Sequence, residues 1–135
     1  MDGSKLSLIR VDRSDSGIYI CSVSGSTGSR TLNISLLVEH IPMVEASSVL
    51  VSQAPGYPAT LSCQVAGVPV PLVAWHKLGQ GSENQTVVHS HGDTDLVIED
   101  YKDGLLTTSL EFGKISYEDY GDYSCNASNS LGEVS

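Results

Sequence analysis

Basic residues are scarce in this sequence. Of its 135 residues only 7 are Lys or Arg, against 16 Asp and Glu, so the net charge is −9 and the pI is near 4.6. A chain this acidic is poorly suited to coat a phosphate backbone or an anionic membrane surface. We therefore expect no nucleic-acid partner.

Long apolar runs are also missing. No stretch approaches the ~20 apolar residues that a membrane-spanning helix needs, so we expect no direct membrane insertion of this segment. The first residues, 1–5, have no apolar core of the kind found in a secretory signal, and none is predicted there.

Common catalytic motifs are missing from the sequence. It has no Gly-x-Ser-x-Gly elbow, no His-Glu-x-x-His and no glycine-rich phosphate loop before a helix. His89 and His91 could share one face of a strand, but no third ligand stands at a suitable spacing, so a solvated edge strand is the favoured interpretation. A run of acids lacks the spacing of a calcium loop and is interpreted as a solvated face. Its members are Asp93, Asp95, Glu99, Asp100 and Asp103. We expect no metal, no cofactor and no enzymatic activity.

Helical periodicity is absent, and alternation of polar and apolar residues takes its place. Residues 60–65, 73–76, 110–112 and 32–36 alternate with a period of two, which is typical of strands with one buried face. Turn-forming pairs such as Pro55-Gly56 and Asp103-Gly104 separate these segments. The pattern predicts an all-β fold.

The chain repeats itself at an offset of 104 residues. The motif Asp-x-Gly-x-Tyr-x-Cys occurs at 15–21 and again at 119–125, and residues 6–11 match 110–115. A repeat of this length indicates whole domains in tandem. Three cysteines is an odd number, which indicates either reduced thiols or a cysteine whose partner lies elsewhere. In the first copy, the equivalent of Cys63 would precede residue 1, so Cys21 is predicted to be unpaired because of truncation.

These residues resemble the immunoglobulin superfamily, and the likeness covers essentially the whole chain. It is carried by Cys63, Trp75 and Cys125, with Tyr123 two places before the second cysteine. The stretches 67–77 and 125–132 are similar to the intermediate, or I-type, set. The resemblance implies an immunoglobulin-like Greek-key β-sandwich.

The resemblance also implies roles for individual residues. Cys63 and Cys125 would form the inter-sheet disulfide, with Trp75 packed against it. The Tyr123 hydroxyl would bond backbone within 116–119, and Tyr19 would do the same within 12–15. The remaining structural positions of the two motifs are Asp119, Gly121 and Asp15.

The domain organisation follows from aligning the two copies. Residues 1–38 are predicted to be strands E, F and G of one immunoglobulin-like domain, with Leu6, Leu8, Leu32 and Leu36 under-buried. Residues 39–42 are predicted to be a linker. Residues 43–135 are predicted to be an I-set domain truncated in strand G.

The function that this resemblance implies is protein–protein recognition or cell adhesion by part of a tandem extracellular protein. The partner would be a protein ligand or a homophilic immunoglobulin domain, met through exposed strand faces, with 76–89 and the acidic face as candidates. Three sequons, at Asn33, Asn84 and Asn126, favour a glycosylated cell-surface location. Two alternatives stay open: a structural I-set domain of a titin-like cytoplasmic protein, and an ectodomain fragment of a receptor tyrosine kinase or phosphatase.

Overall fold

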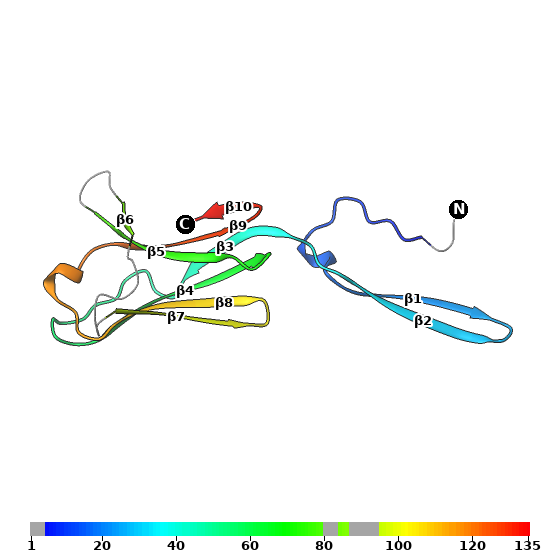
Figure 1. Cartoon of the computed structure of the whole chain (residues 1–135), viewed down its shortest axis with the longest axis horizontal. Coiled ribbons are helices and arrows are strands. Elements are labelled where there is room, and N and C mark those ends of the chain that lie inside the picture. The colour runs from blue at the N-terminus through cyan, green and yellow to red at the C-terminus, as the bar shows by residue number, and fades with distance from the viewer. Residues whose placement is uncertain (1–4, 80–83, 87–94) are drawn as a thin grey trace. The chain divides into compact units, whose positions relative to one another are not determined.

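A computed structural model describes residues 5–79, 84–86 and 95–135 of the chain. It divides into two compact units, Met1–His40 and Ile41–Ser135. Figure 1 shows that the described residues are mostly in strands, with short 3₁₀ turns at Arg13–Asp15 and Tyr117–Asp119. The all-β prediction is therefore confirmed.

The first unit is a β-hairpin preceded by a 3₁₀ turn, η1 (Arg13–Asp15). Strand β1 (Gly17–Gly25) pairs antiparallel with β2 (Gly28–Leu36) along nine residues, joined by a two-residue loop. Residues 6–11, predicted to be strand E, lie outside any strand although the structure describes all of them. A strand needs a neighbour to pair its backbone, and this unit offers 6–11 none of the strands that flank the matching segment in the second unit.

The second unit contains two four-stranded sheets. One has the order β3-β4-β8-β7 and the other the order β10-β9-β5-β6. The strands of the first sheet are β3 (His40–Ala46), β4 (Ala59–Val68), β8 (Leu105–Phe112) and β7 (Asp95–Lys102). Those of the second are β10 (Gly132–Val134), β9 (Tyr123–Asn129), β5 (Leu72–Leu78) and β6 (Asn84–Thr86). This strand order is that of the predicted immunoglobulin-like sandwich. Residues 40–42, which the sequence assigned to a linker, belong to β3.

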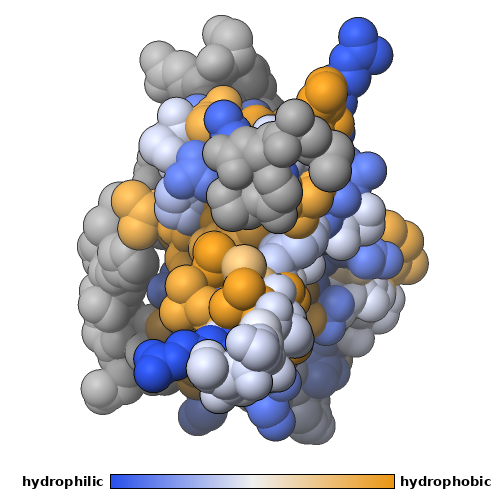
Figure 2. All heavy atoms as spheres, turned by 90° about the vertical axis from the view of Figure 1, so that its right-hand side faces the viewer, coloured by the Kyte–Doolittle hydropathy of each residue, from blue (hydrophilic) through white to orange (hydrophobic). Residues whose placement is uncertain are grey.

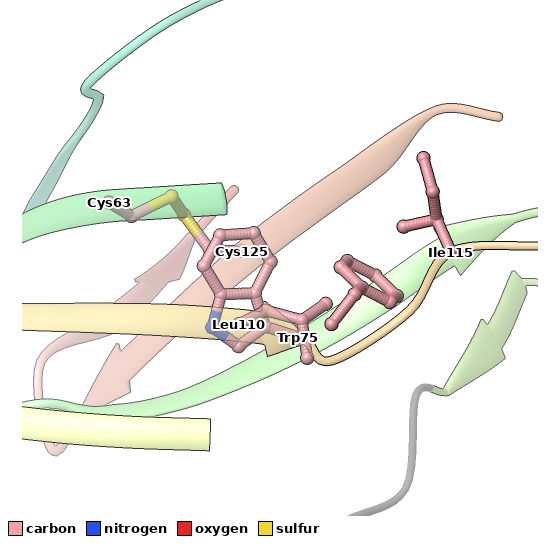
Figure 3. Packing of buried hydrophobic residues seen from close by; sticks show 6 residues of the cluster. Cys63, Trp75, Leu110, Ile115 and Cys125 are labelled. Atoms are coloured by element: carbon pink, nitrogen blue, oxygen red, sulfur yellow. A yellow bond between two sulfur atoms is a disulfide. The ribbon is translucent and has the colours of Figure 1, made fainter. Parts of the chain in front are cut away.

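The core lies between these sheets and is built on a disulfide. Cys63 of β4 and Cys125 of β9 are bonded, as the resemblance implied, and both side chains are buried. Figure 3 shows the disulfide beside the indole ring of Trp75, with Leu110 and Ile115 in the same cluster. Inward and outward side chains alternate along β8 (Leu105–Phe112), so that every second residue enters the core.

Two turns have the backbone geometry that their residues favour. Asp103 and Gly104 connect β7 to β8 with φ of 52° and 80°. Positive φ at both loop positions is what a two-residue type I′ hairpin requires, and Asp-Gly is among its preferred sequences. The register of the β7–β8 pair, with Lys102 opposite Leu105, is thus encoded locally.

Candidate recognition surface

The two Asp-x-Gly-x-Tyr-x-Cys motifs fold alike. The Tyr123 hydroxyl donates to the Asp119 carbonyl over 2.7 Å, and the Tyr19 hydroxyl donates to the Asp15 carbonyl over the same distance. Both bonds fall within the segments that the resemblance implied. The glycine of each motif has a positive φ, 147° at Gly121 and 154° at the matching position of the first copy, which residues with side chains rarely adopt.

The aspartates of these motifs tie down the 3₁₀ turns. The Asp119 carboxylate accepts a hydrogen bond from the Ser116 backbone N–H over 2.7 Å. In the first unit the Asp15 carboxylate accepts in the same way from the Asp12 N–H over 2.8 Å. The Ser14 hydroxyl and the Ser14 backbone N–H both donate to the Asp12 carboxylate. These bonds favour the charged form and hold the pKa of that carboxyl below its ordinary value, with the hydroxyl making the larger contribution.

The outer face of the β10-β9-β5-β6 sheet carries few charged side chains; one of them is the exposed Glu133 of β10, which lies opposite Ser128. On β5 it presents Leu72, which is 79% exposed, and Leu78, which is 42% exposed. The same face carries small or neutral side chains elsewhere on the two central strands. These are Ala74, His76, Ser124, Asn126 and Ser128. Strands β5 and β9 contain no acidic residue, although residues 43–135 hold twelve acids and three bases.

His76 lies in the middle of this face. In β5 it is half-buried, between Thr86 of β6 and Ser124 of β9. Its Nδ1 atom is buried and has no hydrogen-bond partner. A polar atom that is shielded from water without a partner destabilises the site unless something else satisfies it. Part of the segment 76–89, which the sequence singled out, lies outside the described residues, including His89.

The acidic face predicted from the sequence is not a single surface. Glu99 and Asp100 are neighbours on β7, so their side chains point to opposite sides of the sheet. Asp103 sits beyond them in the turn, and Asp93 and His91 lie outside the described residues. Within the described parts of the chain, no three His, Cys, Asp or Glu residues gather as a metal site would require.

The three sequon asparagines occupy different environments. Asn33 is exposed on β2, opposite Ile20. Asn126 is half-buried on the outer face of β9, where its side-chain oxygen accepts from the Ser124 hydroxyl over 3.3 Å. Asn84 begins β6, and its side chain lies outside the described residues.

Apolar side chains of the first unit are open to solvent. Leu6, Leu8 and Leu32 are 71%, 42% and 64% exposed, and Leu36 is half-buried. None of the four is buried, in agreement with the prediction that they are under-buried. Cys21 is exposed and forms no disulfide with any described cysteine. Figure 2 shows hydrophobic side chains on the surface of one face of the molecule.

Sequence reasoning missed the polar contact that orients the core tryptophan. The Trp75 indole N–H donates to the Thr108 hydroxyl over 3.0 Å, and Thr108 is fully buried. A signal was present: Thr108 alternates in phase with Leu106 and Leu110, so a strand would point it inward. A buried hydroxyl needs a hydrogen-bond partner.

The sandwich, its disulfide and its tyrosine corner together define an immunoglobulin domain. A sequence profile of the immunoglobulin domain matches residues 42–129. The chain therefore belongs to the immunoglobulin-domain family. Within the described residues no helix has the length and apolarity needed to cross a membrane.

Several known proteins are similar to this chain. Protein amalgam of Drosophila melanogaster is 32% identical over 128 residues, covering 92% of this chain and 36% of amalgam. Neural cell adhesion molecule 1 of Gallus gallus is 29% identical over 134 residues, covering 99% of this chain and 12% of that protein. In a crystal structure of Dpr2 Ig1-Ig2 in complex with DIP-Theta Ig1-Ig3, one chain matches with a TM-score of 0.80 at 25% identity, covering 94% of this chain and 41% of that chain. The chain thus spans about a third or less of these curated relatives.

Proposed function

We propose that the chain is a non-catalytic recognition module of a tandem-immunoglobulin extracellular protein, and that it binds another immunoglobulin domain. Similarity to a protein whose name states cell adhesion, and to a complex between immunoglobulin proteins, supports this function. The fold alone would not, because one fold serves many functions.

The observation that carries the proposal is the outer face of β10-β9-β5-β6. The centre of a protein interface is depleted in charge and contains anchoring apolar side chains. The exposed Leu72 and Leu78 on β5 meet that description, since β5 and β9 contain no acid and Glu133 of β10 lies at the edge of the face. Because the two central strands carry no acid, a second domain of similar charge can approach them with little direct repulsion.

The experiment compares two substitutions in matched positions. Leu78 on β5 and Ile98 on β7 are each 42% exposed, and they lie on different sheets. Beads coated with the whole chain are tested for clustering, with the chain itself as the probe. We expect the wild type and Ile98→Lys to cluster, and Leu78→Lys to lose clustering by at least tenfold.

Each other outcome is informative. Equal clustering of the two variants would exclude this face as the contact. Both variants keep the same exposed apolar side chains in the first unit, so nonspecific adhesion through that unit cannot produce a difference between them. Absence of clustering in the wild type would exclude a second copy as partner and with it the proposed homophilic contact.

Glycosylation gives a second test, because Asn126 lies on the proposed contact face. A glycan attached there would project from β9 and cover neighbouring positions, so occupancy and contact should exclude one another. We expect Asn126→Gln to increase clustering of chain secreted from cells that glycosylate, with Asn33→Gln as the control. An unchanged glycan mass in both variants would withdraw the proposed sites.

A further inference from the structure

Two acidic side chains flank the outer face of the β10-β9-β5-β6 sheet, one near each of its exposed leucines. Glu133 of β10 lies opposite Ser128 of β9, and Ser128 lies opposite Leu72 of β5, so Glu133 is level with Leu72. The Leu78 N–H donates to the Asp122 carbonyl over 2.8 Å, which places Asp122 directly opposite Leu78. Both acids are exposed. The two ends of the face therefore each carry one apolar side chain and one carboxylate.

The two acids are far enough apart to act separately. Leu72 and Leu78 lie at the two ends of β5, about 20 Å apart at ~3.3 Å per residue. The Debye length is only about 8 Å at physiological ionic strength. A partner on this face therefore meets two separate negative positions, with the uncharged centre of the sheet between them.

No Lys or Arg of the second unit lies on this face. Residues 43–135 contain only Lys77, Lys102 and Lys114. Lys77 alternates with Trp75 on the inner side of β5, where its Nζ lies 5.7 Å from the centroid of the Tyr123 ring. Lys102 ends β7 of the other sheet, and Lys114 follows β8. The outer face of a second copy would therefore bring two more acids and no Lys or Arg to pair with them.

Charge thus disfavours a contact between two identical faces. In an isologous contact both copies use the same surface, so the rim acids of both enter one interface. When the strands of the two copies run antiparallel, Glu133 of one copy comes level with Asp122 of the other. Like charges facing one another across an interface suppress that pairing, and opposite charges at the same places favour another partner.

We propose that Glu133 and Asp122 determine which immunoglobulin domain the outer face binds. The preferred partner presents an uncharged face with a Lys or Arg at two positions about 20 Å apart, one for each acid. This inference rests on the proposed function and adds the chemistry of the partner. The exposed leucines supply the contact, and the two acids supply its charge specificity, so that two copies of the chain bind one another more weakly than either binds a partner with a basic rim.

The probe for such a partner is the chain itself with both acids reversed, Glu133→Lys together with Asp122→Lys. Wild-type and reversed chains are coated on beads of two colours, without glycans because Asn126 lies on this face, and with Cys21→Ser so that the exposed thiol cannot link beads. We expect contacts between beads of different colour to exceed contacts among wild-type beads about fivefold, since like-charged pairs become ion pairs. Reversed beads should cluster among themselves no better than wild-type beads. Raising the salt from about 0.1 M to about 1 M shortens the Debye length from about 10 Å to about 3 Å and should reduce the preference below about twofold.

The matched control reverses one Glu and one Asp on the other sheet, Glu45→Lys together with Asp100→Lys. Both residues are exposed, on β3 and β7, and the net charge of the chain changes by the same amount. Contacts between these beads and wild-type beads should stay within about twofold of those among wild-type beads, because exposed charges away from the contact add little. An equal gain for the control would overturn the proposal, because net charge alone would then explain the preference.

Three other results would also overturn it, and they separate it from the proposed function. If wild-type beads cluster through Leu78 but mixed contacts are no more frequent, the two acids do not face the partner, and only the charge specificity fails. If mixed contacts are fewer, the acids pair with bases of a second copy, and the face selects its own kind. If Leu72→Ser in both chains leaves mixed clustering unchanged, the contact does not use the outer face, and the proposed function fails as well.

Discussion

Replacing Thr108 by Val tests whether the core tryptophan depends on a hydrogen bond as well as on packing. The side chains are similar in size, but the variant removes the acceptor of the Trp75 indole N–H. Thr108 is fully buried and Trp75 is 5% exposed, so water cannot replace the lost partner. Leaving a buried donor unsatisfied costs about 1–3 kcal/mol. We expect the free energy of unfolding of the second unit to fall by about 2 kcal/mol.

The assay is urea unfolding followed by fluorescence, since Trp75 is the single tryptophan of the chain. For a unit of this size, ~2 kcal/mol corresponds to a decrease in Tm of roughly 8–16 °C. The control is Thr107→Val, on the same strand but facing outward, which should change stability by less than about 0.5 kcal/mol.

A double-mutant cycle then separates the bond from the packing. Trp75→Phe removes the donor, so Thr108→Val in that background should cost less than about 0.5 kcal/mol, with circular dichroism replacing fluorescence. An equal loss of stability in both backgrounds would refute the reasoning, because it would assign the whole effect to packing of the threonine.

Three further predictions follow from single positions. Gly67→Ala should destabilise by about 1–3 kcal/mol in urea unfolding, because the added Cβ would lie 2.5 Å from Pro71 Cγ; wild-type stability would show that the ring can move aside. Gly104→Ala should cost only about 1 kcal/mol in the same assay, since its φ is 80° but the added carbon meets open space. Ser14→Ala should raise the pKa of Asp12 in an NMR titration; in the wild type that pKa is lowered by folding, so the stabilisation is present above the unfolded-state pKa and is lost as pH falls through the folded-state pKa.

What the sequence could predict was set by local alternation and by the repeated motif. The strand that carries Cys63 and the two tyrosine hydrogen bonds follow from residues close together in the chain. The face proposed for recognition did not follow, because burial of an outward residue depends on both neighbouring strands. Glu99 and Asp100 illustrate this: adjacent in sequence, they lie on opposite sides of β7 and cannot form one acidic face.

The two copies of one pattern show why alternation is necessary for a strand but insufficient. Residues 6–11 match residues 110–115, and the second segment contributes Leu110 and Phe112 to β8 and to the core. Strand β8 lies between β4 and β7, so both of its edges are paired and its inward side chains have a sheet to pack against. Residues 6–11 have the same alternation, yet all of them are described and they form no strand. The β1–β2 hairpin nevertheless keeps the register of β9–β10, because its two-residue turn brings its own partner strand alongside. Hairpin pairing is therefore encoded within a few residues, whereas strand E is encoded jointly with strands far away in the chain, and its sequence alone cannot produce it.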